Sequence, residues 1–216
     1  MRRSPGAAVG LLSTLLLASC GGGTPSATPP STSTTSTTAP ALDLHSVDWM
    51  TTTVPGPVCP GVTAPIQLSG GQATIPTPAG LDAGTPQLAV SEGTVVYGDL
   101  YGNGRDVAAV NVLCSNTGGT ADGQLESSWV VFSGASGTPT ALATLLPQQA
   151  SSAGNHVAMF DAGSAGIVIA SGQITTHEAF YGSNDPTCCP SGRATTVWTL
   201  ANGTFSPHTT VQTSPS

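Results

Sequence analysis

The chain has 216 residues, of which 11 are acidic and four are basic, all four of them arginine. Its formal charge at pH 7 is −7, and its sequence contains no lysine. Nucleic acids and anionic lipid headgroups are bound by clusters of basic residues. The composition therefore excludes both modes of binding, and it also excludes covalent catalysis by a lysine amine.

Residues 1–19 have the pattern of an export signal. Arg2 and Arg3 give a basic start, and the apolar stretch 7–17 is too short to cross a bilayer comfortably. The letters LASC, which end at Cys20, resemble the lipobox of bacterial lipoproteins. That resemblance implies cleavage before Cys20, a diacylglycerol on its sulfur and anchoring to the outer face of the cytoplasmic membrane. The alternative is an ordinary export signal in which the cysteine has no role.

Residues 20–41 are expected to form the lipid anchor and a disordered tether. The stretch 24–40 consists of Ser, Thr, Pro and Ala, so it cannot bury enough apolar surface to offset its conformational entropy. In the polyproline II conformation it would span roughly 50 Å, and its composition also suits O-linked sugars. Loss of Arg2 and Arg3 with the signal would take the formal charge from −7 to −9.

Residues 42–216 have a suitable length for one domain with its own core. Short apolar stretches rich in Val, Ile and Thr recur there between turn residues, a pattern typical of strands. These stretches are residues 94–100, 106–114, 127–132, 140–146, 156–160, 166–177 and 195–200. Asn202-Gly203 between two such segments predicts a tight hairpin. We predict a mainly β domain of antiparallel strands, a sandwich or partly open barrel, in which residues 141–149 could form one short helix.

A second hairpin is predicted around the sequence GDLYGNGRD, residues 98–106. It resembles loops in extracellular β proteins that place carboxylates at alternate positions, some of which hold calcium. Here Asp99, Asn103 and Asp106 are the candidate ligands, but Tyr101 stands where a second acid is usual. A tight turn in which Asp99 and Asn103 bond local N–H groups is the preferred interpretation, with weak calcium binding as the alternative.

Four cysteines remain if Cys20 carries lipid, and an even number in an exported protein indicates disulfides. Consecutive Cα atoms lie 3.8 Å apart, whereas ordinary disulfides have Cα distances of about 4.4–6.8 Å. We therefore expect Cys188 and Cys189 to bond separately to Cys59 and Cys114, in an order that the sequence leaves open. An extended backbone at the pair would point the two side chains in opposite directions.

Two other interpretations of the cysteine pair remain. Zinc binding would need C-x-x-C spacing or matching histidines, which the sequence lacks. A bridge between Cys188 and Cys189 would be of the labile kind that serves as a redox switch.

Two motifs together resemble actinobacterial lipoproteins of the LppP/LprE type. The first is the turn at Gly98, Asp99 and residues 102–105, and the second is the segment DPTCCPS, residues 185–191. The resemblance covers residues 95–205, and it departs from the family at Asn103 and Val107, where acidic residues are usual. It implies an exported protein with disulfides, and it implies no reaction.

The sequence carries no motif of a hydrolase, a nucleotide-binding protein or a zinc protease. A site assembled only in three dimensions would most readily use His177, Glu178 and Asp185. Three hypotheses follow: a non-catalytic envelope module that binds a protein, glycan or lipid, which we favour; an envelope hydrolase; and a calcium-aided adhesion or structural domain. No metal or cofactor other than calcium is expected.

Overall fold

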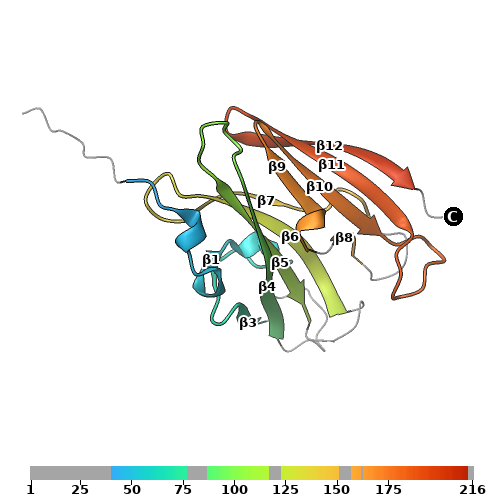
Figure 1. Cartoon of the computed structure of the whole chain (residues 1–216). Helices are drawn as coiled ribbons and strands as arrows, with labels where there is room; N and C mark the ends of the chain where they lie inside the picture. Colours follow the sequence, from blue (N-terminus) through green and yellow to red (C-terminus); the bar gives the residue numbers. More distant parts are fainter. Residues whose placement is uncertain (1–39, 77–86, 117–122, 151–156, 162, 214–216) are drawn as a thin grey trace, which may run out of the picture. The chain divides into compact units, whose positions relative to one another are not determined.

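The computed structural model describes residues 40–76, 87–116, 123–150, 157–161 and 163–213. All of them belong to one compact unit, Thr38–Ser216. Two five-stranded antiparallel sheets dominate this unit (Figure 1). The first, here called the central sheet, has the order β3-β4-β5-β6-β7, with the bounds Gln72–Pro76, Gln87–Gly98, Val107–Ser115, Gln124–Ser133 and Thr140–Leu145.

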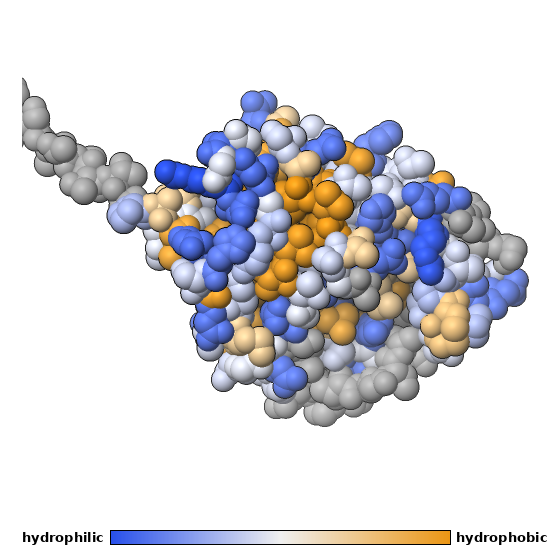
Figure 2. Space-filling model, viewed as in Figure 1, coloured by the Kyte–Doolittle hydropathy of each residue, from blue (hydrophilic) through white to orange (hydrophobic). Residues whose placement is uncertain are grey.

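The second sheet has the order β12-β11-β10-β8, and β9 also pairs with β10. Its strands are β8 (Met159–Phe160), β9 (Ile167–Ala170), β10 (Gln173–Phe180), β11 (Gly192–Ala201) and β12 (Thr204–Thr213). The 3₁₀ turn η5 (Gly163–Gly166) leads into β9. β4 of the central sheet contacts β9, and Figure 2 shows an apolar area of the surface in this region. On β9, Val168 is 53% exposed.

A third layer, residues 42–69, is here called the N-terminal layer. It contains only short elements: the 3₁₀ helices η1 (Leu44–Ser46), η2 (Trp49–Thr51) and η3 (Gly56–Val58), and the paired strands β1 (Thr53–Val54) and β2 (Ile66–Gln67). Asp43 and Asp48 cap the first two helices, because their carboxylates accept the N–H groups of His45 and Met50.

Both faces of the central sheet are covered, which explains why β5 is apolar along most of its length. Val107 and Ala109 face the core shared with the second sheet, whereas Val110 and Cys114 face the N-terminal layer. Successive residues of a strand point to opposite faces, so a strand buried on both sides gives a nearly continuous apolar sequence.

The predicted mainly β fold is confirmed, and the antiparallel sheets form no closed barrel. The hairpin at Asn202-Gly203 is also confirmed, since it joins β11 to β12 with φ angles of 51° and 77°. The helix considered for residues 141–149 is wrong. Residues 141–145 belong to β7, where Leu145 pairs with Trp129 and is buried, so pairing with β6 overrides the local helical preference.

Candidate functional site

The turn between β4 and β5 is held by its own polar side chains. The Asp99 carboxylate accepts the N–H groups of Asn103 (3.0 Å) and Gly104 (2.7 Å). Asn103 Oδ1 in turn accepts the N–H of Arg105 at 3.0 Å. The φ angles of Gly102 and Gly104 are 64° and 74°, a region that glycine enters at little cost. The N–H groups, that of Gly104 first, hold the pKa of Asp99 below its ordinary value. The predicted turn is confirmed.

Each of the three candidate calcium ligands is bonded to another group of the protein. Asp99 and Asn103 bond the turn itself, and Asp106 Oδ2 lies 2.9 Å from His45 Nε2. Within the described part of the chain, no three His, Cys, Asp or Glu side chains gather where they could hold a metal ion. This geometry offers calcium no ready set of ligands.

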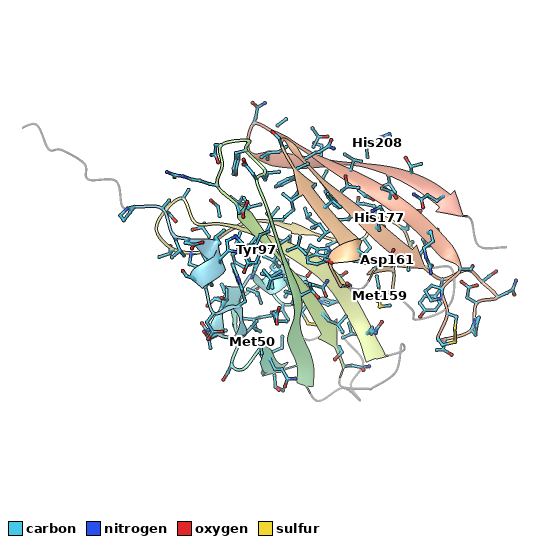
Figure 3. All side chains as sticks on the ribbon, in the orientation of Figure 1. Met50, Tyr97, Met159, Asp161, His177 and His208 are labelled. Carbon is cyan, nitrogen blue, oxygen red and sulfur yellow. A yellow bond between two sulfur atoms is a disulfide. The ribbon has the colours of Figure 1, made fainter. Side chains whose placement is uncertain are left out.

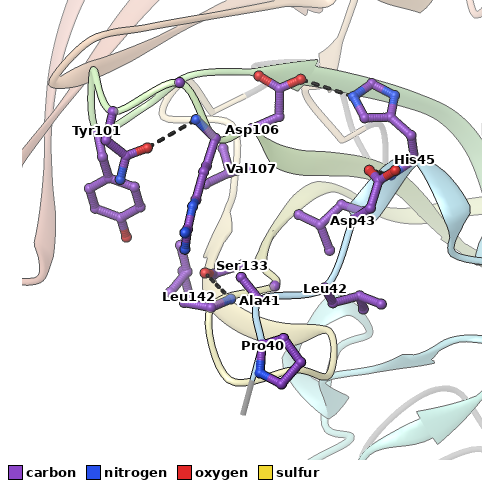
Figure 4. Close-up of a pocket in the computed structure, with 16 residues that line it drawn as sticks. Pro40, Ala41, Leu42, Asp43, His45, Tyr101, Asp106, Val107, Ser133 and Leu142 are labelled. Atoms are coloured by element: carbon purple, nitrogen blue, oxygen red, sulfur yellow. Dashed lines mark hydrogen bonds and ion pairs between the residues drawn. The ribbon is translucent and has the colours of Figure 1, made fainter. Parts of the chain in front are cut away.

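The same turn forms one wall of a pocket of about 940 Å³ (Figure 4). We call it the N-terminal pocket, because residues 40–45 form its opposite wall, and residues 133–135 and Leu142 complete it. Residues 40–45 lie beside the end of β6, since the Leu42 N–H donates to the carbonyl of Gly134, the residue after β6, at 2.8 Å. A Cβ on Gly134 would lie 2.5 Å from the Leu42 carbonyl oxygen, so only glycine permits this close approach.

His45 connects the two walls of the pocket. Besides its bond to Asp106, its ring stacks on Tyr97 with centroids 3.9 Å apart. The Tyr97 hydroxyl accepts a hydrogen bond from Trp49 Nε1 at 2.9 Å. Tyr97 lies on the central sheet (Figure 3), so this chain of contacts fixes the N-terminal layer against β4.

The pocket carries one arginine, Arg105. Among the residues that the structure describes, no side chain or carbonyl accepts a hydrogen bond or ion pair from its guanidinium. The lining also contains the carboxylates of Asp43 and Asp106, the amide of Asn103 and the exposed ring of Tyr101. Donors, acceptors, an aromatic face and apolar side chains therefore surround one cavity. Sequence reasoning considered Asn103 as a turn residue or a metal ligand and Asp106 as a metal ligand, and it missed the pocket. The reason is that the two opposite walls come from segments about 60 residues apart in the chain.

The predicted pairing of the cysteines is wrong for all four. Cys59 is bonded to Cys114, with Cα atoms 5.3 Å apart. Both residues lie in the core between the N-terminal layer and the central sheet, where they are 1% and 0% exposed. Cys114 faces away from the second sheet, and Cys188 and Cys189 follow a strand of that sheet, so the fold keeps the predicted partners apart.

Cys188 is bonded to its neighbour Cys189. An extended backbone would have pointed the two side chains in opposite directions, but residues 186–189 form a turn in which the Cys189 N–H donates to the Pro186 carbonyl at 3.0 Å. The two side chains therefore do not point to opposite faces. Both cysteines are exposed, and they lie in the connection between β10 and β11, residues 181–191, here called the disulfide loop.

The three residues considered for a hydrolase have separate roles. Glu178 is fully buried, and its carboxylate accepts the N–H groups of Gln148 (2.8 Å) and Gln149 (3.1 Å) and the hydroxyl of Thr196 (2.5 Å). His177, the preceding residue on β10, lies 3.1 Å from the Thr195 hydroxyl. Figure 3 shows His177 on the second sheet, whereas Tyr97 lies on the central sheet.

Asp185 closes the disulfide loop. Its Oδ2 atom accepts the N–H groups of Gly182 (2.7 Å) and Ser191 (2.8 Å) and the Ser191 hydroxyl (3.0 Å). These donors, the Ser191 N–H first, lower the pKa of Asp185. Asp185 thus acts as a structural acceptor, with no bond to His177 or Glu178.

No protein-family model, curated protein or solved structure matches this chain. Cys20, the expected signal and all of the expected tether except Pro40 and Ala41 lie outside the described residues. Within those that are described, no helix is both long and apolar enough to span a membrane. The resemblance to lipoproteins of the LppP/LprE type stays a prediction.

Proposed function

We propose that the chain is an exported lipoprotein, held by lipid at Cys20 to the outer face of the cytoplasmic membrane, whose β domain binds an envelope glycan without catalysis. The export pattern of residues 1–19, the lipobox-like LASC and the Ser/Thr/Pro stretch 24–40 support the location. The resemblance to the LppP/LprE type supports the same compartment. The binding role depends on the N-terminal pocket.

The observation that carries the proposal is the mixed lining of that pocket. A glycan presents hydroxyl groups, which both donate and accept hydrogen bonds, and ring faces that are apolar. The pocket offers the donors Arg105 and the amide NH2 group of Asn103, the acceptor Asp43, and the ring of Tyr101, which is 49% exposed. Its volume of about 940 Å³ lies within the range of ligand sites.

Charge favours a neutral glycan over a polyanion. Two carboxylates, those of Asp43 and Asp106, lie in the same lining as Arg105. The chain has a formal charge of −7 even before any signal is removed. A net negative field lowers the local concentration of anionic ligands, so the guanidinium serves better as a hydrogen-bond donor to hydroxyl groups.

The test is binding of the purified full chain to an array of neutral and acidic oligosaccharides. We expect neutral oligosaccharides to bind, and Arg105→Gln to weaken binding roughly tenfold or more, since a hydrogen bond to a charged group contributes about 1.5–3 kcal/mol. Arg193→Gln is the matched control, because its guanidinium bonds the Pro190 and Gly192 carbonyls in the disulfide loop. It should leave affinity unchanged.

Two outcomes would contradict the glycan assignment. One is equal weakening by Arg105→Gln and Arg193→Gln, which would show that binding does not involve the pocket. The other is the absence of oligosaccharide binding together with Arg105-dependent binding to micelles of short-chain phosphatidylglycerol, which would replace the glycan by a lipid.

A further inference from the structure

The two disulfides differ in what can reach them. Cys188 and Cys189 are both exposed in the disulfide loop, whereas Cys59 and Cys114 are 1% and 0% exposed. Exchange begins when a thiolate attacks a disulfide sulfur, so access to the sulfur is a requirement. An incoming thiol can approach the adjacent pair without any opening of the fold.

The disulfide loop keeps its shape through bonds that do not involve sulfur. Asp185 ties Gly182 near its start to Ser191 at its end. The Tyr181 hydroxyl donates to the Thr187 carbonyl at 2.9 Å, immediately before the cysteine pair. Opening of the Cys188–Cys189 bond would leave all three contacts in place.

Prolines on both sides limit how far the two cysteines can separate. Pro186 and Pro190 have a fixed φ, and each restricts the residue before it. The turn bond from the Cys189 N–H to the Pro186 carbonyl also belongs to the backbone alone. Two free thiols would therefore stay close together and could form their bond again.

We propose that the disulfide loop is a thiol–disulfide exchange site that accepts two electrons from a dithiol. The donor thiolate attacks one sulfur of the Cys188–Cys189 bond, forming a mixed disulfide, and the displaced sulfur leaves as a thiolate that takes up a proton. The second donor thiol then loses its proton and attacks the donor sulfur of the mixed disulfide. The donor's own disulfide forms, and the other cysteine is released as a thiolate that takes up a proton. The chain gains two thiols, and the donor leaves with a disulfide of its own. A disulfide oxidant reverses the sequence.

The experiment uses the full chain carrying Cys20→Ser, so that Cys20 contributes no thiol, and dithiothreitol as the dithiol. Samples are alkylated at intervals and analysed by mass spectrometry. We expect two alkyl groups, on Cys188 and Cys189, while the Cys59–Cys114 bond stays intact. The buried bond should react at least about 100-fold more slowly, because attack on it requires local opening of the core. Oxidised glutathione should restore the adjacent bond.

Three variants sharpen the result. Cys188→Ser/Cys189→Ser should take up no alkyl group under the same conditions. Cys188→Ser alone should form a one-to-one mixed disulfide between Cys189 and glutathione. Asp185→Ala should slow the return of the adjacent bond several-fold, because the loop loses the contacts that keep the thiols close.

The proposal is overturned if both disulfides become reducible together, only once urea has unfolded the chain. It is also overturned if peptide mapping joins Cys188 or Cys189 to Cys59 or Cys114. Reduction of the adjacent pair without re-formation by oxidised glutathione would likewise contradict a reversible exchange site.

Discussion

The two faces of the central sheet are covered by layers that are held in different ways. The N-terminal layer consists of 3₁₀ turns and two-residue strands, and a buried disulfide bonds its Cys59 to Cys114 of β5. The second sheet has five strands and no covalent bond to the central sheet among the described residues. It packs through large side chains such as Trp198. The covalent link thus lies where regular hydrogen bonding is sparsest.

The second sheet has a polar anchor in place of that link. The buried carboxylate of Glu178 binds residues 148 and 149, which follow β7 of the central sheet. It also accepts the Thr196 hydroxyl from β11. A buried polar group is tolerated when hydrogen bonds satisfy it. One face of the central sheet therefore depends on a disulfide and the other on a hydrogen-bonded carboxylate.

Removal of the buried disulfide should have the largest effect on stability. Cys59→Ala/Cys114→Ala opens a loop with a sequence separation of 55, and chain entropy then predicts a loss of about 4 kcal/mol in the free energy of unfolding. Urea denaturation of the variant against the parent measures this loss.

Cys188→Ala/Cys189→Ala is the matched control, since adjacent residues close no chain loop. Its free energy of unfolding should change by no more than about 0.5 kcal/mol. Equal losses for the two double variants would show that the N-terminal layer does not depend on its crosslink.

Removal of the polar anchor should have the next largest effect. Glu178→Ala removes the acceptor of the buried Thr196 hydroxyl and of the partly buried N–H groups of Gln148 and Gln149. An unsatisfied buried group costs about 1–3 kcal/mol, so we expect a loss of roughly 2 kcal/mol in the free energy of unfolding. His177→Ala, one residue earlier on β10 and half-buried, should lose much less. If the two variants unfold at the same urea concentration, Glu178 does not anchor the second sheet.

The sequence predicted the strands better than it predicted the faces that they present. Local signals indicated β4 to β7 and the last hairpin. These signals are the short apolar stretches rich in β-branched residues and the dipeptide Asn202-Gly203. The sequence of β5 did not show which residues face which layer, since both faces of the strand are buried and nearly all of its residues are apolar. The face of Cys114 decides the disulfide pairing, so the pairing could not be derived from the pattern.

The candidate site was predictable only in part, for a similar reason. The turn at Asp99 follows from local chemistry, and it was predicted correctly together with its glycines. The N-terminal pocket needs residues 40–45 to lie against that turn, a contact between distant segments. Glu178 is a charged residue in the core, where a period of two predicts an apolar one, so its burial was not foreseen.

The smallest expected effects concern pH, and they separate two kinds of carboxyl group. Partial burial raises the pKa of Glu126 above its ordinary value of 4.5, although the Ser127 N–H opposes the shift. Hydrogen bonds, that of the Ser191 N–H first, lower the pKa of Asp185 below 3.8. A raised carboxyl pKa means that Glu126 destabilises the fold at neutral pH, and that this penalty disappears as the pH falls through its folded pKa toward 4.5. A lowered pKa means that Asp185 stabilises the fold above 3.8, and that this contribution is lost as the pH falls through its folded pKa.

Substitution by the neutral amide should therefore have opposite signs at the two positions. Glu126→Gln is expected to raise the free energy of unfolding at pH 7 by no more than about 0.5 kcal/mol, and the gain should vanish below pH 4.5. Asp185→Asn should lower stability at pH 7, with a difference that shrinks below pH 3.8. Urea titrations between pH 3 and pH 7 measure both. Glu126 lies on β6 opposite Cys114, whereas Asp185 lies in the disulfide loop. If both substitutions changed the free energy of unfolding in the same direction at pH 7, the surroundings of the two carboxyl groups would not differ as the structure implies.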